Sequence, residues 1–187
     1  TPVKPKNAAL GDYEYPKQYM SWFIKKELKS RNIPGLSIAL VEDQRIIWAE
    51  GFGYADKANN ISARPETIYA VGSISKLFTA TAAMQLAEQY KIDIDSPLQT
   101  YLPEFSIQSR FPDAGPITLR NIMTHHSGLP LDFKKGIQSR NPEPLTSLVT
   151  LIKDEYVAYP PNFAFSYSNL GVTLLGAAIQ NVTGRDF

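Results

Sequence analysis

The sequence of 187 residues contains no cysteine and only two histidines, and each of these shortages excludes a kind of site. Without cysteine the chain forms no disulfide and offers no thiolate to a metal, although the compartment stays open because many periplasmic proteins also lack cysteine. The histidines, His125 and His126, are adjacent, and adjacent side chains on a helix point apart. They lack the spacing of a zinc site, so we interpret both as structural.

The chain also lacks a dominant sign of charge and any long apolar run. The formal net charge is +1, and the longest basic clusters are the pairs Lys25-Lys26 and Lys134-Lys135. Nucleic acid and anionic membrane surfaces are therefore not expected as partners. No apolar run approaches the ~20 residues of a membrane-spanning helix. Residues 1–7 resemble a polar leader exposed after processing, which indicates a secreted or periplasmic protein whose signal peptide has been removed.

The apolar residues that are present predict a chain with both helices and strands. Hydrophobic residues make up 43% of the sequence, which is enough for an ordinary globular core. Two β-branched and apolar runs separated by a polar turn predict a β-hairpin, whereas residues 51–65 show no period and are interpreted as a loop. Apolar residues at helical spacing, bounded by caps and breakers, predict helices. The expected elements are strands at 36–41 and 45–50 and helices at 17–30, 75–90, 119–125, 145–155 and 170–181.

The motif Ser73-Ile74-Ser75-Lys76 lies where an extended segment, residues 67–71, turns into the predicted helix 75–90. Three residues apart on the first turn, Ser73 and Lys76 share a face, with about 5–6 Å between their Cβ atoms. An amine held neutral can take the hydroxyl proton and activate the serine as a nucleophile. This helix is apolar nearly all round, so we expect it inside the protein, with Lys76 at the edge of a dry interior. The same residues also fit a serine that only caps a helix.

A second motif, Tyr167-Ser168-Asn169, follows the break at Pro160-Pro161 and precedes the last predicted helix. Taken alone, it fits a helix cap at Ser168 or Asn169, with the Tyr167 hydroxyl at the surface. Its occurrence in one chain with the Ser-x-x-Lys motif favours a shared chemical role.

Together these motifs resemble those of the penicillin-recognising serine hydrolases, in particular the class C β-lactamase and D-alanyl-D-alanine carboxypeptidase-like family with its esterase relatives. Residues 72–80 are similar to the first motif of that family, residues 117–130 to its intervening helix and turn, and residues 165–171 to its second motif. The resemblance runs from about Trp22 to the C-terminus, with the three segments in the same order as in the family.

The resemblance implies roles for four residues. Ser73 would be the nucleophile that accepts the acyl group, with its own backbone N–H as one oxyanion donor. Lys76 would be the base, or the cation that lowers the proton affinity of Tyr167, and the choice between the two stays open. Tyr167 would exchange protons with the leaving group and the deacylating water. Asn169 would hydrogen-bond the substrate amide and Lys76. The resemblance implies no metal and no organic cofactor.

The sequence departs from the family pattern at two points. Asn162 stands where relatives often carry glycine, and asparagine tolerates left-handed backbone angles. The third motif of the family, a Lys-Thr-Gly or His-x-Gly on a strand, comes well after Tyr-x-Asn, and too little sequence follows Asn169 to hold it. His126-Ser127-Gly128 matches by letters alone and is interpreted as a helix-terminating turn. We therefore expect the N-terminal portion of a longer protein, poorly active without a missing C-terminal segment that completes the fold.

The sequence predicts a serine β-lactamase/transpeptidase-like fold, with an α/β lobe containing an antiparallel sheet flanked by helices, and an all-α lobe. Residues 1–81 would form the N-terminal part of the α/β lobe, residues 82–175 the helical lobe, and residues 176–187 the start of the return to the α/β lobe.

The predicted function is that of a serine hydrolase acting through an acyl-enzyme on a small-molecule or peptide substrate, which could be a β-lactam, a D-alanyl peptide or an ester. The alternative is a non-hydrolysing β-lactam- or muropeptide-binding sensor module on the same scaffold, which would keep Ser73 without deacylating. A hydrolase of the Ser-His-Asp α/β type would need Gly-x-Ser-x-Gly, which does not occur.

Overall fold

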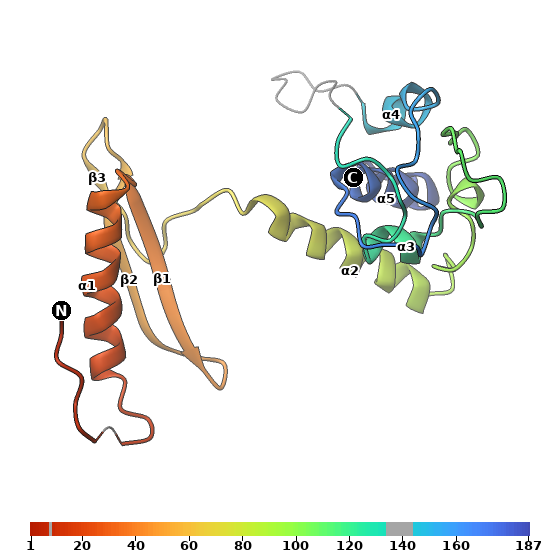
Figure 1. Cartoon of the computed structure of the whole chain (residues 1–187). Helices are drawn as coiled ribbons and strands as arrows, with labels where there is room; N and C mark the ends of the chain where they lie inside the picture. Colours follow the sequence, from red (N-terminus) through yellow and green to blue (C-terminus); the bar gives the residue numbers. More distant parts are fainter. Residues whose placement is uncertain (8, 134–143) are drawn as a thin grey trace. The chain divides into compact units, whose positions relative to one another are not determined.

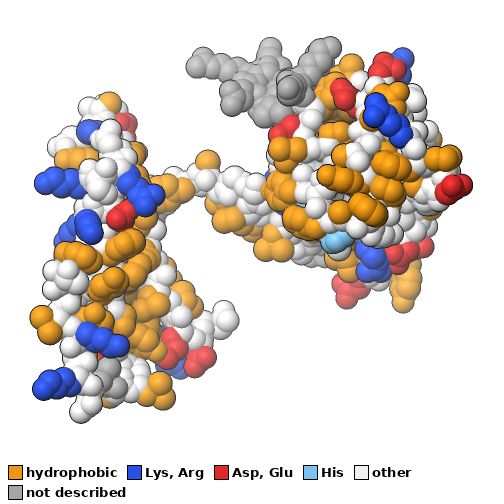
Figure 2. Space-filling view, viewed as in Figure 1, with side chains coloured by type: hydrophobic (Ala, Val, Ile, Leu, Met, Phe, Trp, Pro, Cys, Tyr) orange, Lys and Arg blue, Asp and Glu red, His pale blue; other side chains and the backbone are white. Residues whose placement is uncertain are grey.

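The chain forms two compact units, Thr1–Ala70 and Val71–Phe187, in a computed structural model that describes residues 1–7, 9–133 and 144–187 (Figure 1). The pair Lys134-Lys135 lies outside the described residues. The predicted lobe boundaries at residues 81 and 175 stay a prediction. Each unit carries charged side chains of both signs on the face seen in Figure 2, with apolar side chains exposed among them.

The first unit is a helix, α1 (Glu14–Ser30), and a three-stranded antiparallel sheet in the order β1-β2-β3, made of β1 (Gly35–Glu42), β2 (Arg45–Asp56) and β3 (Ile61–Ser62). The β1–β2 connection contains two residues, Asp43 and Gln44, with φ angles of 44° and 65°. Positive φ at both central residues is the geometry of the two-residue turns that match the twist of a hairpin. The predicted helix and hairpin are confirmed.

The interpretation of residues 51–65 as a loop is wrong for the first part of that stretch, because β2 continues to Asp56 and β3 pairs with it. Two glycines in this part of β2 are positions of close backbone approach. A Cβ on Gly51 would lie 2.2 Å from the carbonyl oxygen of Ala63, and one on Gly53 would lie 2.4 Å from that of Pro34. Glycine inside a strand often marks such an approach.

The second unit packs its helices around α5 (Asn169–Thr183) (Figure 1). This helix contacts α2 (Ser75–Glu88), α3 (Leu119–Met123) and α4 (Leu145–Leu151), while two short 3₁₀ helices, η1 (Gly72–Ile74) and η2 (Leu98–Thr100), complete the described helices. Leu174, Leu175 and Ala177 of α5 are fully buried. The four helices predicted for this part of the chain are present, although α4 ends at Leu151, four residues before its predicted end.

Within its unit, α2 lies inside the protein on one face only, although its apolar composition predicted an interior helix. Thr79, Ala83 and Leu86 are buried, because one face of the helix packs against α5. On another face, Leu77 is 67% exposed and Phe78 is 69% exposed. Apolar composition alone does not tell which side of a short helix its neighbours cover.

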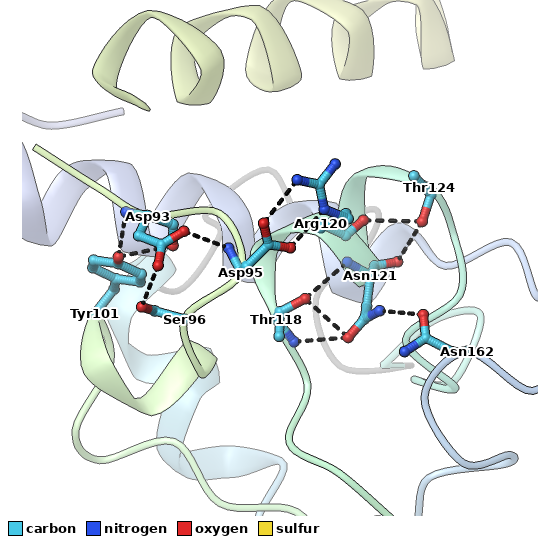
Figure 3. A network of polar contacts seen from close by, with 9 residues as sticks. All are labelled: Asp93, Asp95, Ser96, Tyr101, Thr118, Arg120, Asn121, Thr124 and Asn162. Atoms are coloured by element: carbon cyan, nitrogen blue, oxygen red, sulfur yellow. Dashed lines mark hydrogen bonds and ion pairs between the residues drawn. The ribbon is translucent and has the colours of Figure 1, made fainter. Parts of the chain in front are cut away.

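A polar network holds the short helix α3 (Figure 3). Thr118 and Asn121 form a reciprocal capping box at its N-terminus, an arrangement that satisfies two otherwise unpaired backbone donors. Asn121 also donates from Nδ2 to Oδ1 of Asn162 over 2.7 Å, and Asn162 has the left-handed φ of 66° that its place in the sequence predicted. Arg120 binds both carboxylate oxygens of Asp95, at 2.6 and 2.8 Å.

The turn that ends α3 contains His125 and Gly128 with φ angles of 58° and 72°. His126-Ser127-Gly128 directly follows the turn Thr124-His125 that ends α3, so it lies at a helix end and not on a strand, as predicted. The carbonyl oxygen of Gly128 accepts a hydrogen bond from the backbone N–H of Ala158, and a Cβ on Gly128 would lie 1.9 Å from the carbonyl oxygen of Tyr159. Only glycine fits this position without moving the backbone.

We expect Gly128→Ala to lower the free energy of unfolding by at least about 2 kcal/mol, because a left-handed alanine and the clash with Tyr159 both add strain. The matched control is Gly115→Ala, where no atom lies within 4 Å of the added Cβ and φ is not positive. That variant should stay within about 0.5 kcal/mol of the parent protein. Urea unfolding of the three proteins measures the difference, and equal midpoints for both variants would contradict the analysis.

Candidate active site

Ser73 and Lys76 meet where η1 leads into α2. Ser73 is the central residue of η1, and Lys76 is the second residue of α2. The Nζ atom of Lys76 donates to Oγ of Ser73 over 3.0 Å. Ser73 is exposed and Lys76 is half-buried, so the serine is open to a substrate while the amine is partly withdrawn from solvent. The shared face predicted from the three-residue spacing is present.

Tyr167 reaches the same hydroxyl from 94 residues further along the chain. Its phenol donates to Oγ of Ser73 over 2.9 Å, and Nζ of Lys76 lies 5.1 Å from the centre of its ring. The interaction with Lys76, followed by that with Ser73, lowers the pKa of the Tyr167 phenol below its ordinary value, because both partners stabilise the phenolate. The structure thus brings together the three residues that the two motifs suggested.

Ser168 fixes the backbone between Tyr167 and α5. Its hydroxyl accepts from the backbone N–H of Gly171 over 2.8 Å, as an N-cap does. The same hydroxyl donates to the carbonyl oxygen of Pro130 over 2.6 Å. The interpretation of Ser168 as a helix cap is therefore confirmed, and the cap holds the residue next to the phenol in place.

Asn169 lies near Lys76, but its side-chain amide has a hydrogen-bond partner that the motifs did not suggest. Its Nδ2 atom donates to Oδ1 of Asp132 over 2.7 Å, and its backbone N–H donates to the carbonyl oxygen of Leu131 over 2.7 Å. Among the described residues no hydrogen bond joins Asn169 to Lys76. Both residues do line one hollow of about 240 Å³ on this unit.

Analysis of the motifs also missed how His125 contacts Tyr167. The two ring centres are 4.3 Å apart, and the planes are inclined by 36°. Nδ1 of His125 accepts from the backbone N–H of Ser168 over 3.2 Å. Burial, then the charges of Lys76 and His126, lower the pKa of His125. The separation of residues 125 and 167 in the sequence predicts no contact between them. The one signal for it in the sequence is that residues 117–130 and 165–171 are both similar to motifs of one family.

Among residues 1–7, 9–133 and 144–187, no group of three or more histidine, aspartate or glutamate side chains could hold a metal ion. No helix in the described part of the chain has the length and apolar character needed to cross a membrane. The secreted or periplasmic location stays a prediction.

The arrangement is suited to moving the proton of one hydroxyl. Both the amine of Lys76 and the phenol of Tyr167 lie within hydrogen-bond distance of Oγ of Ser73. Either group, when it lacks its proton, can take one from the serine, and the resulting alkoxide can attack a carbonyl carbon. The positive charge of Lys76 favours the phenolate as the acceptor.

The chain is similar in sequence to a known protein family and to a known protein. Residues 21–187 match the family profile described as Beta-lactamase. Over 172 residues the chain is 28% identical to Protein flp of Staphylococcus aureus, a match that covers 91% of the chain and 34% of flp. It is therefore similar to about a third of that protein.

Two solved structures resemble the fold. The octameric penicillin-binding protein homologue from Pyrococcus abyssi has a TM-score of 0.76 and 30% identity, over 91% of this chain and 40% of its own. The beta-lactamase/D-alanine carboxypeptidase from Yersinia pestis has a TM-score of 0.74 and 25% identity, over 90% of this chain and 48% of its own. The chain spans less than half of each.

We expect the phenol of Tyr167 to titrate below the ordinary value of about 10, and Lys76→Met to move its pKa back up, because the cation that stabilises the phenolate is removed. Phenolate then forms at a higher pH in the variant. NMR of ¹³C-labelled tyrosine follows the titration, and the signal lost in Tyr167→Phe identifies residue 167. An unchanged titration midpoint in Lys76→Met would contradict the role given to the amine.

Proposed function

The chain belongs to the Beta-lactamase family, whose members include serine hydrolases, and from this premise we propose that the protein is a serine hydrolase that forms an acyl-enzyme on Ser73. Membership confirms the predicted serine β-lactamase/transpeptidase-like fold. The proposed substrates are β-lactams, D-alanyl peptides or esters. The names of the similar proteins from Pyrococcus abyssi and Yersinia pestis refer to penicillin binding and to carboxypeptidase activity, and they support this range.

One observation carries the proposal. The hydroxyl of an exposed serine is hydrogen-bonded by both an amine and a phenol, from Lys76 and Tyr167. A serine that only capped a helix would need neither partner, and the structure gives Ser73 no cap hydrogen bond to α2. Two groups on one exposed hydroxyl that can each accept its proton once they have lost their own favour a nucleophile.

The proposed acylation transfers the Ser73 proton to Tyr167 or Lys76 as Oγ bonds to the carbonyl carbon. The negative charge that develops on the carbonyl oxygen is stabilised by the backbone N–H of Ser73. When the bond to the leaving nitrogen or oxygen breaks, the same base returns the proton to the leaving group. In deacylation a water molecule gives a proton to the base, its oxygen attacks the ester carbon, and Ser73 recovers its proton as the acid is released.

Asn169 is proposed to bind the amide or carbonyl group next to the scissile bond. Its hydrogen bond to Asp132 uses one of the two Nδ2 hydrogens, so a second donor and the Oδ1 acceptor remain for a substrate. The carboxylate of Asp132 holds the amide in one orientation, and Asn169 lines the same hollow as Lys76.

We expect the full-length protein to take up a fluorescent penicillin or an activated phosphonate at Ser73, with a mass increase of one adduct, and Ser73→Ala to abolish the labelling because the nucleophile is missing. Ser106→Ala is the matched control, an exposed serine with no hydrogen bond among the described residues, and it should label as the parent does. Intact mass and peptide mapping measure the result. Labelling that survives in Ser73→Ala would refute the assignment.

The same assay separates the enzyme from the non-hydrolysing sensor module. Repeated turnover of a β-lactam or ester after the first labelling event identifies a hydrolase. A single stoichiometric adduct that does not decay identifies the sensor.

We expect Tyr167→Phe to slow acylation of Ser73 by about 10²–10⁴-fold, the range typical of a lost general acid–base group. The ring stays, so packing against His125 is kept and only the hydroxyl is removed. Pre-steady-state labelling rates measure the change. Tyr159→Phe, which removes a hydroxyl from another partly exposed tyrosine of the same unit, should leave the rate unchanged, and equal rates in the two variants would argue against a proton-transfer role for Tyr167.

A further inference from the structure

The two residues that flank Tyr167 are both hydrogen-bonded to His125. The backbone N–H of Ser166 donates to the carbonyl oxygen of His125 over 2.8 Å. The backbone N–H of Ser168 donates to Nδ1 of the His125 ring over 3.2 Å. One residue therefore holds the chain on either side of the phenol that reaches Ser73.

The ring of His125 also packs on the ring of Tyr167, with 4.3 Å between their centres. The rings of Phe165 and His125 are nearly perpendicular, with 5.8 Å between their centres and 81° between their planes. The imidazole thus restricts the direction of the Tyr167 side chain as well as the path of its backbone.

His125 is itself held in an unusual conformation. Its φ of 58° is left-handed, and its backbone N–H donates to the carbonyl oxygen of Ile122 over 3.0 Å. The next residue, His126, is fixed on both sides, because its N–H donates to the carbonyl oxygen of Asn121 and its own carbonyl oxygen accepts from the N–H of Asn162. Asn121 and Asn162, which belong to the polar network drawn in Figure 3, therefore anchor the residue that follows His125.

We propose that His125 is a positioning residue for Tyr167. Its neutral imidazole accepts a hydrogen bond from the Ser168 N–H and supports the phenol ring at Ser73. Protonation of the imidazole releases that support. The inference rests on the proposed function of Ser73 and Tyr167, and it adds a pH dependence to the same site.

Protonation would convert the acceptor into a donor. Nδ1 of an imidazolium carries a hydrogen, so it would face the N–H of Ser168 with no lone pair to offer. Lys76 from α2 and His126 from the same turn oppose the added charge, and the phenol of Tyr167 faces the ring from the segment before α5. Burial, Lys76 and His126 lower the pKa of His125. The neutral form and its contribution to stability are fully present above about pH 6.5, and both are lost as the pH falls through the lowered value.

Asparagine at position 125 tests the acceptor directly. Its Oδ1 atom is bonded to Cγ, as Nδ1 of histidine is, so it can accept from the Ser168 N–H. Asparagine also tolerates left-handed backbone angles and does not titrate. His125→Ala removes both the acceptor and the ring, and His126→Asn controls for the loss of a neighbouring histidine.

The measured quantity is the pH profile of the maximal rate of Ser73 labelling by a fluorescent penicillin. We expect His125→Ala to lower the maximal rate about tenfold or more, with little change in the half-saturating concentration, because a displaced proton-transfer group slows the chemical step. His125→Asn should recover most of that rate at neutral pH and lack the acid decline of the parent protein. His126→Asn should keep the decline. An Asn variant no better than Ala, or one that keeps the acid decline, would overturn the inference.

A second measurement needs no activity and no variant that must fold. NMR of the parent protein follows the His125 ring and the Ser168 amide as the pH is lowered, and both should change with one midpoint below about 6.5. A Ser168 amide that stays unchanged while His125 titrates would overturn the inference. If the midpoints agree but no probe acylates Ser73 at any pH, the proposed function fails while the support of Tyr167 by His125 stands.

Discussion

The hydrogen bond between the hydroxyls of Tyr167 and Ser73 is the contact on which the rest of the site depends, because it joins two helix N-termini that are 94 residues apart in sequence. It exists only if α2 and α5 pack side by side, as they do. It also needs the residue before α5 to be held, and the cap at Ser168 holds it by bonding to the turn at Pro130. A change in either packing or capping would separate the phenol from the serine before any chemical group was lost.

Local sequence patterns correctly predicted the features that depend on residues close in sequence. They predicted less well the features that depend on backbone segments far apart in sequence. The hairpin, the capped helices and the contact of Ser73 with Lys76 follow from spacing. The extension of β2 past Gly51 was missed, because residues 51–65 show no period, and no local pattern reveals that the backbone of Ala63 comes too close to Gly51 for a side chain. The hydrogen bond of Asn169 to Asp132 was also missed, because Asp132 lies in an irregular segment, where no periodicity predicts which way a side chain points.

The positive charge of Lys76 acts on two titratable rings in the same sense. It lowers the pKa of Tyr167 by stabilising the phenolate, and, after burial, it contributes to the lowered pKa of His125 by opposing an imidazolium. Both effects favour the form that has lost its proton. One cation thus biases the proposed base and the ring beside it toward the forms that the proposed chemistry needs, without any buried ion pair in the described part of the site.

The two hydrogen bonds of the Ser168 hydroxyl have a consequence for chemical reagents. Its hydrogen is committed to the carbonyl of Pro130 and its lone pair to the N–H of Gly171, and the residue is 1% exposed. Of the hydroxyls of Ser73 and Ser168, which both lie near Tyr167, an incoming electrophile can therefore reach only that of Ser73. Discrimination between them is built into the helix cap and requires no recognition of the reagent.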